Sequence, residues 1–182
     1  MEQLAEDGAT RFSMDAVAAR AHASKATLYR RWPSAAALLV DAMETTFAPF
    51  ATPDTGSVRQ DLRHVLRGAV HLLTTTPFPR LLAAVIDLAE RDPDLAATHA
   101  ALTNRQRAPL LHILQRGQER GEIGASADLE VLVDLLAAPL FYRRFVAHHP
   151  IPATLPETII HTVLGPDPRH HRRQHSSGSD RR

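Results

Sequence analysis

Apolar residues recur every three or four positions along most of this chain, whereas the alternating, β-branched runs that mark strands are missing. This spacing predicts an all-α fold. Three short helices are expected near the N-terminus, because a capping serine precedes each: Ser13 before MDAVAARA, Ser24 before KATLYRRW and Ser34 before AAALLVDAMETTF. The segment EQLAEDG is predicted to hold the last turns of an earlier helix that ends at Gly8.

A second group of helices is expected after the linker-like segment APFATPDTGS. Apolar stripes at helical spacing predict its members within residues 58–73, 81–86, 129–140 and 155–164. The segment RDPD is expected to start a further helix, in which Pro109 marks a kink or a break, and Pro139 is expected to bend the end of the helix within residues 129–140. The final GPDPRHHRRQHSSGSDRR is too polar to pack and is predicted to be disordered. The expected domains are therefore residues 1–47, residues 57–165 and a basic tail, 166–182.

Charge is distributed unevenly, although the formal net charge is only +1. Between residues 8 and 34, five basic side chains oppose the single acidic residue Asp15, so a polyanion would be attracted there. The chain has no cysteine, which excludes disulfides and thiolate metal sites and fits a reducing cytoplasm. No signal peptide or membrane-spanning apolar run is evident, so we expect a soluble, cytoplasmic protein without a membrane partner.

The segment SMDAVAARAHASKATLYRRW has the pattern of a helix-turn-helix, in which the second helix enters the major groove of DNA. Val17 and Ala18 of the first helix are expected to face Leu28 of the second. The exposed part of the second helix then carries basic and hydroxyl groups, and its capping serine would lie near a phosphate. Charge alone does not distinguish this arrangement from an ordinary solvated helix face.

The longer segment MDAVAARAHASKATLYRRWPSAAALLVDAM resembles the DNA-binding module of the TetR family of bacterial transcriptional regulators. More weakly, RGQERGEI and PLFYRRFV resemble the helical C-terminal domain of a subgroup of such regulators. The resemblance implies an N-terminal helix-turn-helix domain of three helices, followed by a helical domain for ligand binding and dimerisation. The DNA-contacting residues expected on this basis are Ser13, Ser24, Lys25, Thr27, Tyr29, Arg30 and Arg31.

Three features depart from the family pattern. His22 stands in the turn where the family usually has glycine, which is strained if the residue has a positive φ. Ala35 stands where a lysine is common, so one expected phosphate contact is missing. The first helix is expected to lack most of its length, so either the start site is wrongly placed or the DNA-binding domain is shortened and binds weakly.

Enzymatic interpretations find little support in the sequence. His148 and His149 are adjacent at a helix end, the other clustered histidines lie in the tail, and no paired carboxylates at helical spacing accompany them. No serine has the strand-turn-helix setting of a hydrolase nucleophile. We therefore expect no catalytic residues, no metal site and no cofactor.

Binding to an operator requires two recognition helices about 34–36 Å apart, so a homodimer on double-stranded DNA is expected. An apolar face could form an intersubunit four-helix bundle, as in the family, or serve as core within one chain. The residues of this face are Leu129, Leu132, Val133, Leu136, Leu140, Ile159, Ile160 and Val163.

Regulation is expected from an apolar small molecule that favours a conformation unable to bind DNA. The candidate pocket residues, which an unliganded core would also require, are Leu81, Leu82, Val85, Leu110, Leu111, Leu114, Phe141 and Phe145. The favoured hypothesis is thus a ligand-responsive, one-component regulator, with repression favoured over activation. The alternative is a dimeric, helical small-molecule-binding protein whose DNA binding is impaired or lost.

Overall fold

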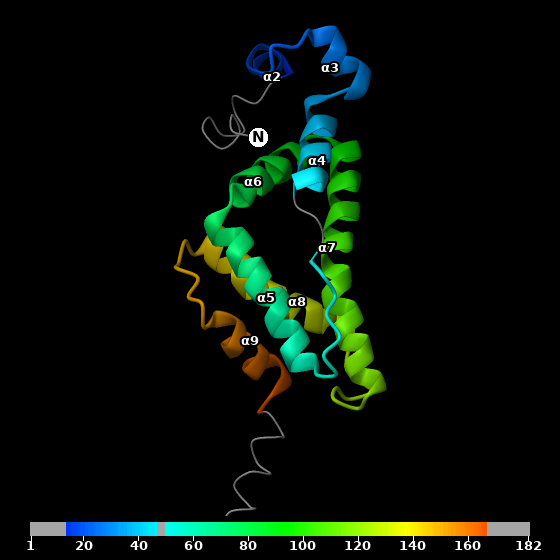
Figure 1. Cartoon of the computed structure of the whole chain (residues 1–182), viewed down its shortest axis with the longest axis vertical. Coiled ribbons are helices and arrows are strands. Elements are labelled where there is room, and N and C mark those ends of the chain that lie inside the picture. The colour runs from blue at the N-terminus through cyan, green and yellow to red at the C-terminus, as the bar shows by residue number, and fades with distance from the viewer. Residues whose placement is uncertain (1–13, 47–49, 167–182) are drawn as a thin grey trace, which may run out of the picture. The chain divides into compact units, whose positions relative to one another are not determined.

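The computed structural model describes residues 14–46 and 50–166. Within these ranges every regular element is helical, which confirms the predicted all-α fold (Figure 1). The helices are α2 (Met14–Arg20), α3 (Lys25–Arg31), α4 (Ala35–Thr46), α5 (Val58–Thr75), α6 (Phe78–Ala89), α7 (Pro93–Glu119), α8 (Leu129–Phe141), the π-helix η2 (Tyr142–Val146) and α9 (Leu155–Leu164). The predictions for Gly8, for Ser13 and for the tail from residue 167 onward lie outside the described residues.

The chain forms two compact units, each built from two stretches of sequence. The first unit contains Met1–Ala51 and His71–Pro109, and the second contains Thr52–Val70 and Leu110–Arg182. The divisions fall inside α5 and α7, so each of these helices contributes residues to both units. The predicted domain boundaries follow the order of the chain instead, and they stay a prediction.

A small apolar cluster joins α2 to α3 in the first unit. Met14 and Ala18 of α2 and Leu28 of α3 form its buried centre. Partly buried side chains packed against this centre are Val17, Trp32, Ala35 and Leu38. Both helices have only seven residues, about two turns each, so few side chains are available to deepen the cluster.

In the same unit α4 packs against α6 (Figure 1). Buried side chains on α4 are Leu39, Val40 and Met43, and those on α6 include Phe78, Leu81, Leu82 and Val85. Arg105 of α7 donates a hydrogen bond to Glu44 near the end of α4. The helix after the α2–α3 pair is therefore fixed by both apolar packing and an ion pair.

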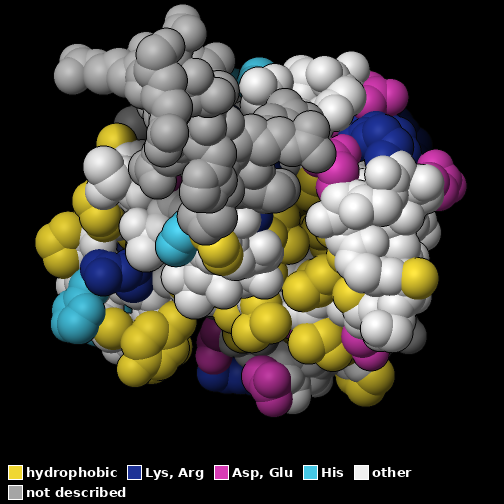
Figure 2. Space-filling view, turned by 90° about the horizontal axis from the view of Figure 1, so that it is seen from below, with side chains coloured by type: hydrophobic (Ala, Val, Ile, Leu, Met, Phe, Trp, Pro, Cys, Tyr) yellow, Lys and Arg dark blue, Asp and Glu magenta, His cyan; other side chains and the backbone are white. Residues whose placement is uncertain are grey.

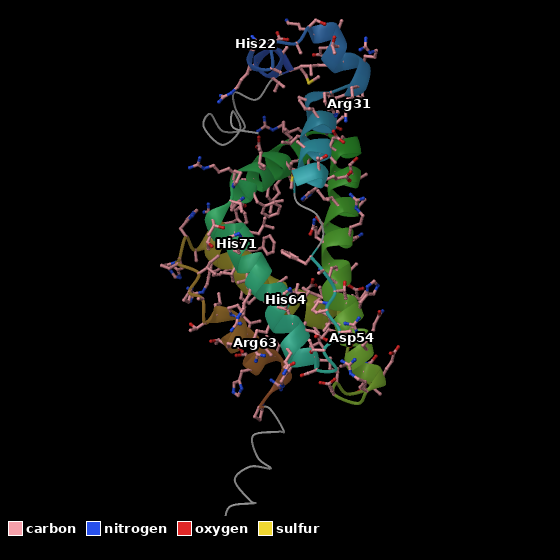
Figure 3. All side chains as sticks on the ribbon, viewed as in Figure 1. His22, Arg31, Asp54, Arg63, His64 and His71 are labelled. Carbon is pink, nitrogen blue, oxygen red and sulfur yellow. The ribbon has the colours of Figure 1, made fainter. Side chains whose placement is uncertain are left out.

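The second unit has a deeper core, in which α8 packs against α9. Its fully buried side chains include Leu62, Leu66, Ile113, Leu114, Val133, Leu136 and Leu140. Basic residues of α5 reach α9: Arg63 Nε donates to Glu157 Oε1 at 2.6 Å, and Arg59 Nη2 donates to the Gly165 carbonyl at 2.8 Å (Figure 3). The Arg63–Glu157 ion pair and the hydrogen bond from Arg59 thus connect α5 to α9 and to the residue that follows it.

A buried carboxylate fixes the segment that enters α5. Asp61 is fully buried, and its Oδ1 accepts hydrogen bonds from the backbone N–H and hydroxyl of Thr55, at 3.0 and 2.7 Å. Arg116 of α7 lies 3.7 Å from Asp61 Oδ2 and 3.7 Å from Asp54 Oδ1 (Figure 3). Because a buried charge is tolerated only with partners, these contacts define the path of residues 54–61.

The two prolines have different effects. α7 continues through Pro109, so the helix is not interrupted there. Shortly after Pro139, α8 passes into the π-helix η2, whose register lets Ala147 N–H donate to the Tyr142 carbonyl at 2.9 Å. Of the helices described, none is by itself long and apolar enough to cross a bilayer, although α5 and α6 meet that test as a bent pair.

Candidate nucleic-acid interface

A tight turn joins α2 to α3. The Ala23 N–H donates to the Ala18 carbonyl at 3.0 Å, and the His22 N–H donates to the Ala19 carbonyl at 3.3 Å. These bonds form a Schellman motif, in which the donor of the inner bond, the first residue beyond the helix end, adopts a left-handed conformation and is usually glycine. His22 occupies that position with a φ of 50° (Figure 3), so the strain considered from the sequence is present.

Ser24 then starts α3 as its N-cap, as predicted. Its hydroxyl accepts a hydrogen bond from the Thr27 N–H at 3.2 Å and lies 2.9 Å from the Thr27 hydroxyl. The first turn of α3 is thereby closed by the side chains of two predicted DNA contacts. Both hydroxyls stay at the surface, where each retains capacity for a further hydrogen bond.

Only one residue of α3 is buried, so the helix exposes nearly all of its side chains. Leu28 anchors it in the apolar cluster, and the indole of Trp32 beyond its end donates from Nε1 to Asp41 Oδ2 at 3.0 Å. The described DNA-contact candidates are all exposed: Ser24, Lys25, Thr27, Tyr29, Arg30 and Arg31. The structure thus brings them together on one short helix, while Ser13 is outside the described residues.

The three cations of this helix have different surroundings. Lys25 Nζ donates to Asp15 Oδ2 of α2 at 2.7 Å, and this hydrogen bond raises the pKa of the lysine above its ordinary value. Arg31 lies 4.0 Å from Asp41 and stacks 4.7 Å from the centre of the Trp32 ring (Figure 3). For Arg30 no ion pair is recorded with any described residue. Its guanidinium is therefore the most available of the three to an external anion.

Sequence reasoning missed the two carboxylates that face these cations. In the sequence Asp15 stands out only as the single acidic residue of a basic region, and Asp41 does not stand out at all. Their partners lie ten residues away along the chain, Asp15 to Lys25 and Asp41 to Arg31, on different helices. Such pairs do not follow the i, i+4 spacing of a single helix, so a helical pattern gives no sign of them.

Family models match both parts of the chain. Residues 1–42 match the model described as bacterial regulatory proteins, tetR family, and residues 52–163 match that described as tetracyclin repressor-like, C-terminal domain. An HTH-type transcriptional regulator of Mycobacterium bovis is 34% identical over 166 residues, which cover 90% of this chain and 81% of the relative. This chain belongs to the TetR family of bacterial transcriptional regulators.

Two further similarities support the assignment of this TetR-family chain. The DNA-binding transcriptional repressor TetR of Mycobacteroides abscessus is 38% identical over 149 residues, covering 79% of this chain and 76% of the relative. The solved structure of the TetR family transcription regulator SCO0332 has a TM-score of 0.69 and 34% identity, covering 92% of this chain and 93% of that chain. The protein is thus a helix-turn-helix transcriptional regulator, and its family is one of regulators rather than enzymes.

In this TetR-family regulator, most residues of the predicted dimer face are buried within the chain itself. Val133, Leu136, Leu140, Ile159 and Ile160 are buried, whereas Leu129, Leu132 and Val163 are half-buried. Large apolar side chains that are exposed instead include Val131 and Leu135 at 50% each and Tyr142 at 60%. Hydrophobic side chains also lie between charged ones on the surface shown in Figure 2.

The predicted pocket residues are divided between the two units. Leu81, Leu82 and Val85 are buried on α6 in the first unit. Those of the second unit are Leu110 and Leu114, which are buried, Leu111 and Phe145, which are half-buried, and Phe141, which is exposed. Phe141 and Phe145 stack with their ring centres 6.1 Å apart. Each group packs within its own unit, and their role in binding an effector stays a prediction.

Proposed function

We propose that this regulator binds operator DNA as a homodimer and represses transcription, with α3 as the recognition helix. The observation that supports this most directly is the capped, exposed α3, which presents Lys25, Tyr29 and Arg30 from a turn of the helix-turn-helix type. Repression is proposed by similarity to the Mycobacteroides abscessus relative, whose name describes a DNA-binding repressor. The site of action would be the cytoplasm, where the chromosome is accessible.

Selection from a pool of randomised duplex DNA tests the proposal and does not require the operator to be known. The expected product is an inverted repeat whose half-sites are centred about 10 base pairs, or a multiple of that, apart. A pool that yields no consensus sequence would contradict the proposal, because specific recognition by two related helices must leave such a repeat.

Arg30→Ala sharpens the test, because Arg30 forms no ion pair with another described residue. The substitution therefore removes a surface cation without breaking an ion pair in the described part of the chain. Operator affinity is expected to fall about tenfold to hundredfold. Arg91→Ala is the matched control, since Arg91 is an exposed arginine that pairs only locally with Asp87, at 2.8 Å. Equal affinities for the wild type and Arg30→Ala would contradict the proposed contact of Arg30 with DNA.

The dimer is proposed to form through α8 and α9, with the half-buried Leu129, Leu132 and Val163 supplemented by an exposed stripe on α8 and the first residue of η2. This stripe consists of Val131, Leu135 four positions later and Tyr142 seven positions after that. Such spacings place the three side chains on one helix face. Leu135→Glu is expected to give a monomer in sedimentation analysis. Ile86→Glu, at an exposed apolar position of α6, is the matched control and should stay dimeric.

The effector is proposed to be an apolar small molecule, because the candidate pocket residues are leucines, a valine and phenylalanines. It would release DNA by favouring a dimer whose two helix-turn-helix modules are wrongly spaced. Native mass spectrometry of the purified protein, before and after extraction with organic solvent, tests for such a bound compound.

A further inference from the structure

Asp15 and Lys25 face each other across the helix-turn-helix. The Lys25 Nζ donates to the Asp15 carboxylate at 2.7 Å, although both side chains are well exposed, at 63% and 61%. Charge-assisted bonds of this length are among the stronger hydrogen bonds in proteins. The ammonium is therefore held by a group of α2 before any DNA arrives.

This pairing changes what Lys25 contributes to attraction by DNA. Affinity for DNA without regard to sequence comes almost entirely from cations that neutralise phosphates and release counterions. A lysine paired with a carboxylate adds almost no net charge to the surface. Lys25 thus adds little to sequence-independent binding while Asp15 is present.

The same bond also limits the freedom of Lys25. A lysine side chain has four rotatable bonds, and part of its rotamer entropy is lost when it is ordered on binding. Asp15 already restrains the ammonium, so part of this ordering precedes contact with an operator. A restrained side chain favours the one geometry that suits its target over the many geometries of random DNA.

We propose that Asp15 is a specificity-determining residue, an intramolecular counterion that weakens the attraction of Lys25 to DNA of any sequence while it positions the ammonium for the operator. The inference rests on the proposed function, because it assumes that α3 is the recognition helix. Arg30, which has no counterion among the described residues, would add its full charge to the attraction by DNA of any sequence as well as contacting the operator.

The experiment measures affinity for the selected operator and for a scrambled duplex of equal length over a range of salt concentrations. Asp15→Asn keeps a hydrogen-bond acceptor but removes the charge. Its affinity for the scrambled duplex should rise about two- to fivefold, and the slope of log affinity against log salt should steepen by about 0.9. The ratio of operator to scrambled affinity should fall, because the operator complex also loses the positioned ammonium.

Asp87→Asn is the matched control, since it removes the same charge from the exposed ion pair between Asp87 of α6 and Arg91 just beyond that helix. Equal effects of Asp15→Asn and Asp87→Asn would overturn the proposal, because net charge alone would then explain them. Amide hydrogen exchange within α2 of both variants checks that this helix is intact. Loss of the Asp15 carboxylate from the first turn of α2 could affect stability, but it would not steepen the salt dependence.

The Lys25→Ala background separates the pair from its parts. There Asp15→Asn releases no ammonium, so the operator-to-scrambled ratio should stay constant. A ratio that falls as far as it does with Lys25 present contradicts the proposal. If the wild type binds operator and scrambled DNA equally well, the proposed function itself fails. If the wild type prefers the operator and Asp15→Asn leaves that preference unaltered, only the role of Asp15 fails.

Discussion

The α2–α3 pair and the second unit are stabilised in different ways. The pair has a centre of three buried side chains, and its ion pair between Lys25 and Asp15 is exposed. The second unit buries large side chains from α5, α7, α8 and α9, and it contains the fully buried Asp61. The comparison indicates that the pair keeps its polar groups at the surface, even where they form an ion pair, whereas the second unit uses buried polar groups to hold its own helices.

The same substitution in the two regions should therefore have unequal effects, the larger in the second unit. Leu136 is fully buried on α8, and Leu136→Ala should lower the free energy of unfolding by about 4 kcal/mol through lost burial and a residual cavity. Urea denaturation followed by circular dichroism measures it. A loss below about 1 kcal/mol would mean that this part of the core is not close-packed.

Leu28→Ala tests the shallower cluster. Leu28 is 6% exposed, and its neighbours can relax, so the expected loss is about 2 kcal/mol, at the lower end for such changes. Amide hydrogen exchange should quicken in α2 and α3 and stay unchanged in α8 and α9. Equal acceleration in all four helices would show that the two regions unfold as one, so that their different cores would not make them independent.

Sequence reasoning recovered the helices because their apolar spacing and capping residues are local features. Ser24 and His22 are read directly from neighbouring positions, and both occupy the expected places at the turn. The contacts of Lys25 with Asp15 and of Arg116 with Asp61 join separate helices, so they depend on packing that no periodic pattern encodes. The burial of Val133 and Leu136 could not be predicted either, because an apolar stripe suits both a core and an interface.

His22→Gly should stabilise the α2–α3 turn by about 0.5–1 kcal/mol, because glycine adopts a positive φ without the steric penalty of a side chain. His148 has the same φ of 50° in the loop after η2, so His148→Gly should stabilise the second unit for the same reason. His64→Gly, in the regular helix α5, should instead destabilise by about 1 kcal/mol. Thermal melts of the three variants measure these effects. A melting temperature lowered by His22→Gly, as expected for His64→Gly, would contradict the interpretation of the turn.

The smallest effect expected is the acid dependence of the ion pair between α5 and α9. The hydrogen bond from Arg63 holds the pKa of Glu157 below the usual range of a glutamate, and the charge of Arg67 acts in the same direction. Because the folded pKa is the lower one, the pair stabilises the protein above the ordinary glutamate pKa, and this contribution is lost as pH falls through the folded value.

Since the Glu157 side chain is 40% exposed, its contribution should be under about 1 kcal/mol. The difference in unfolding free energy between the wild type and Glu157→Gln should thus be largest near neutral pH and vanish once the pH lies below the lowered pKa of Glu157. Glu119→Gln, at the exposed end of α7, is the matched control. If this difference in unfolding free energy persists unchanged in acid, Glu157 acts through packing rather than charge. Packing alone would then stabilise the second unit at this position.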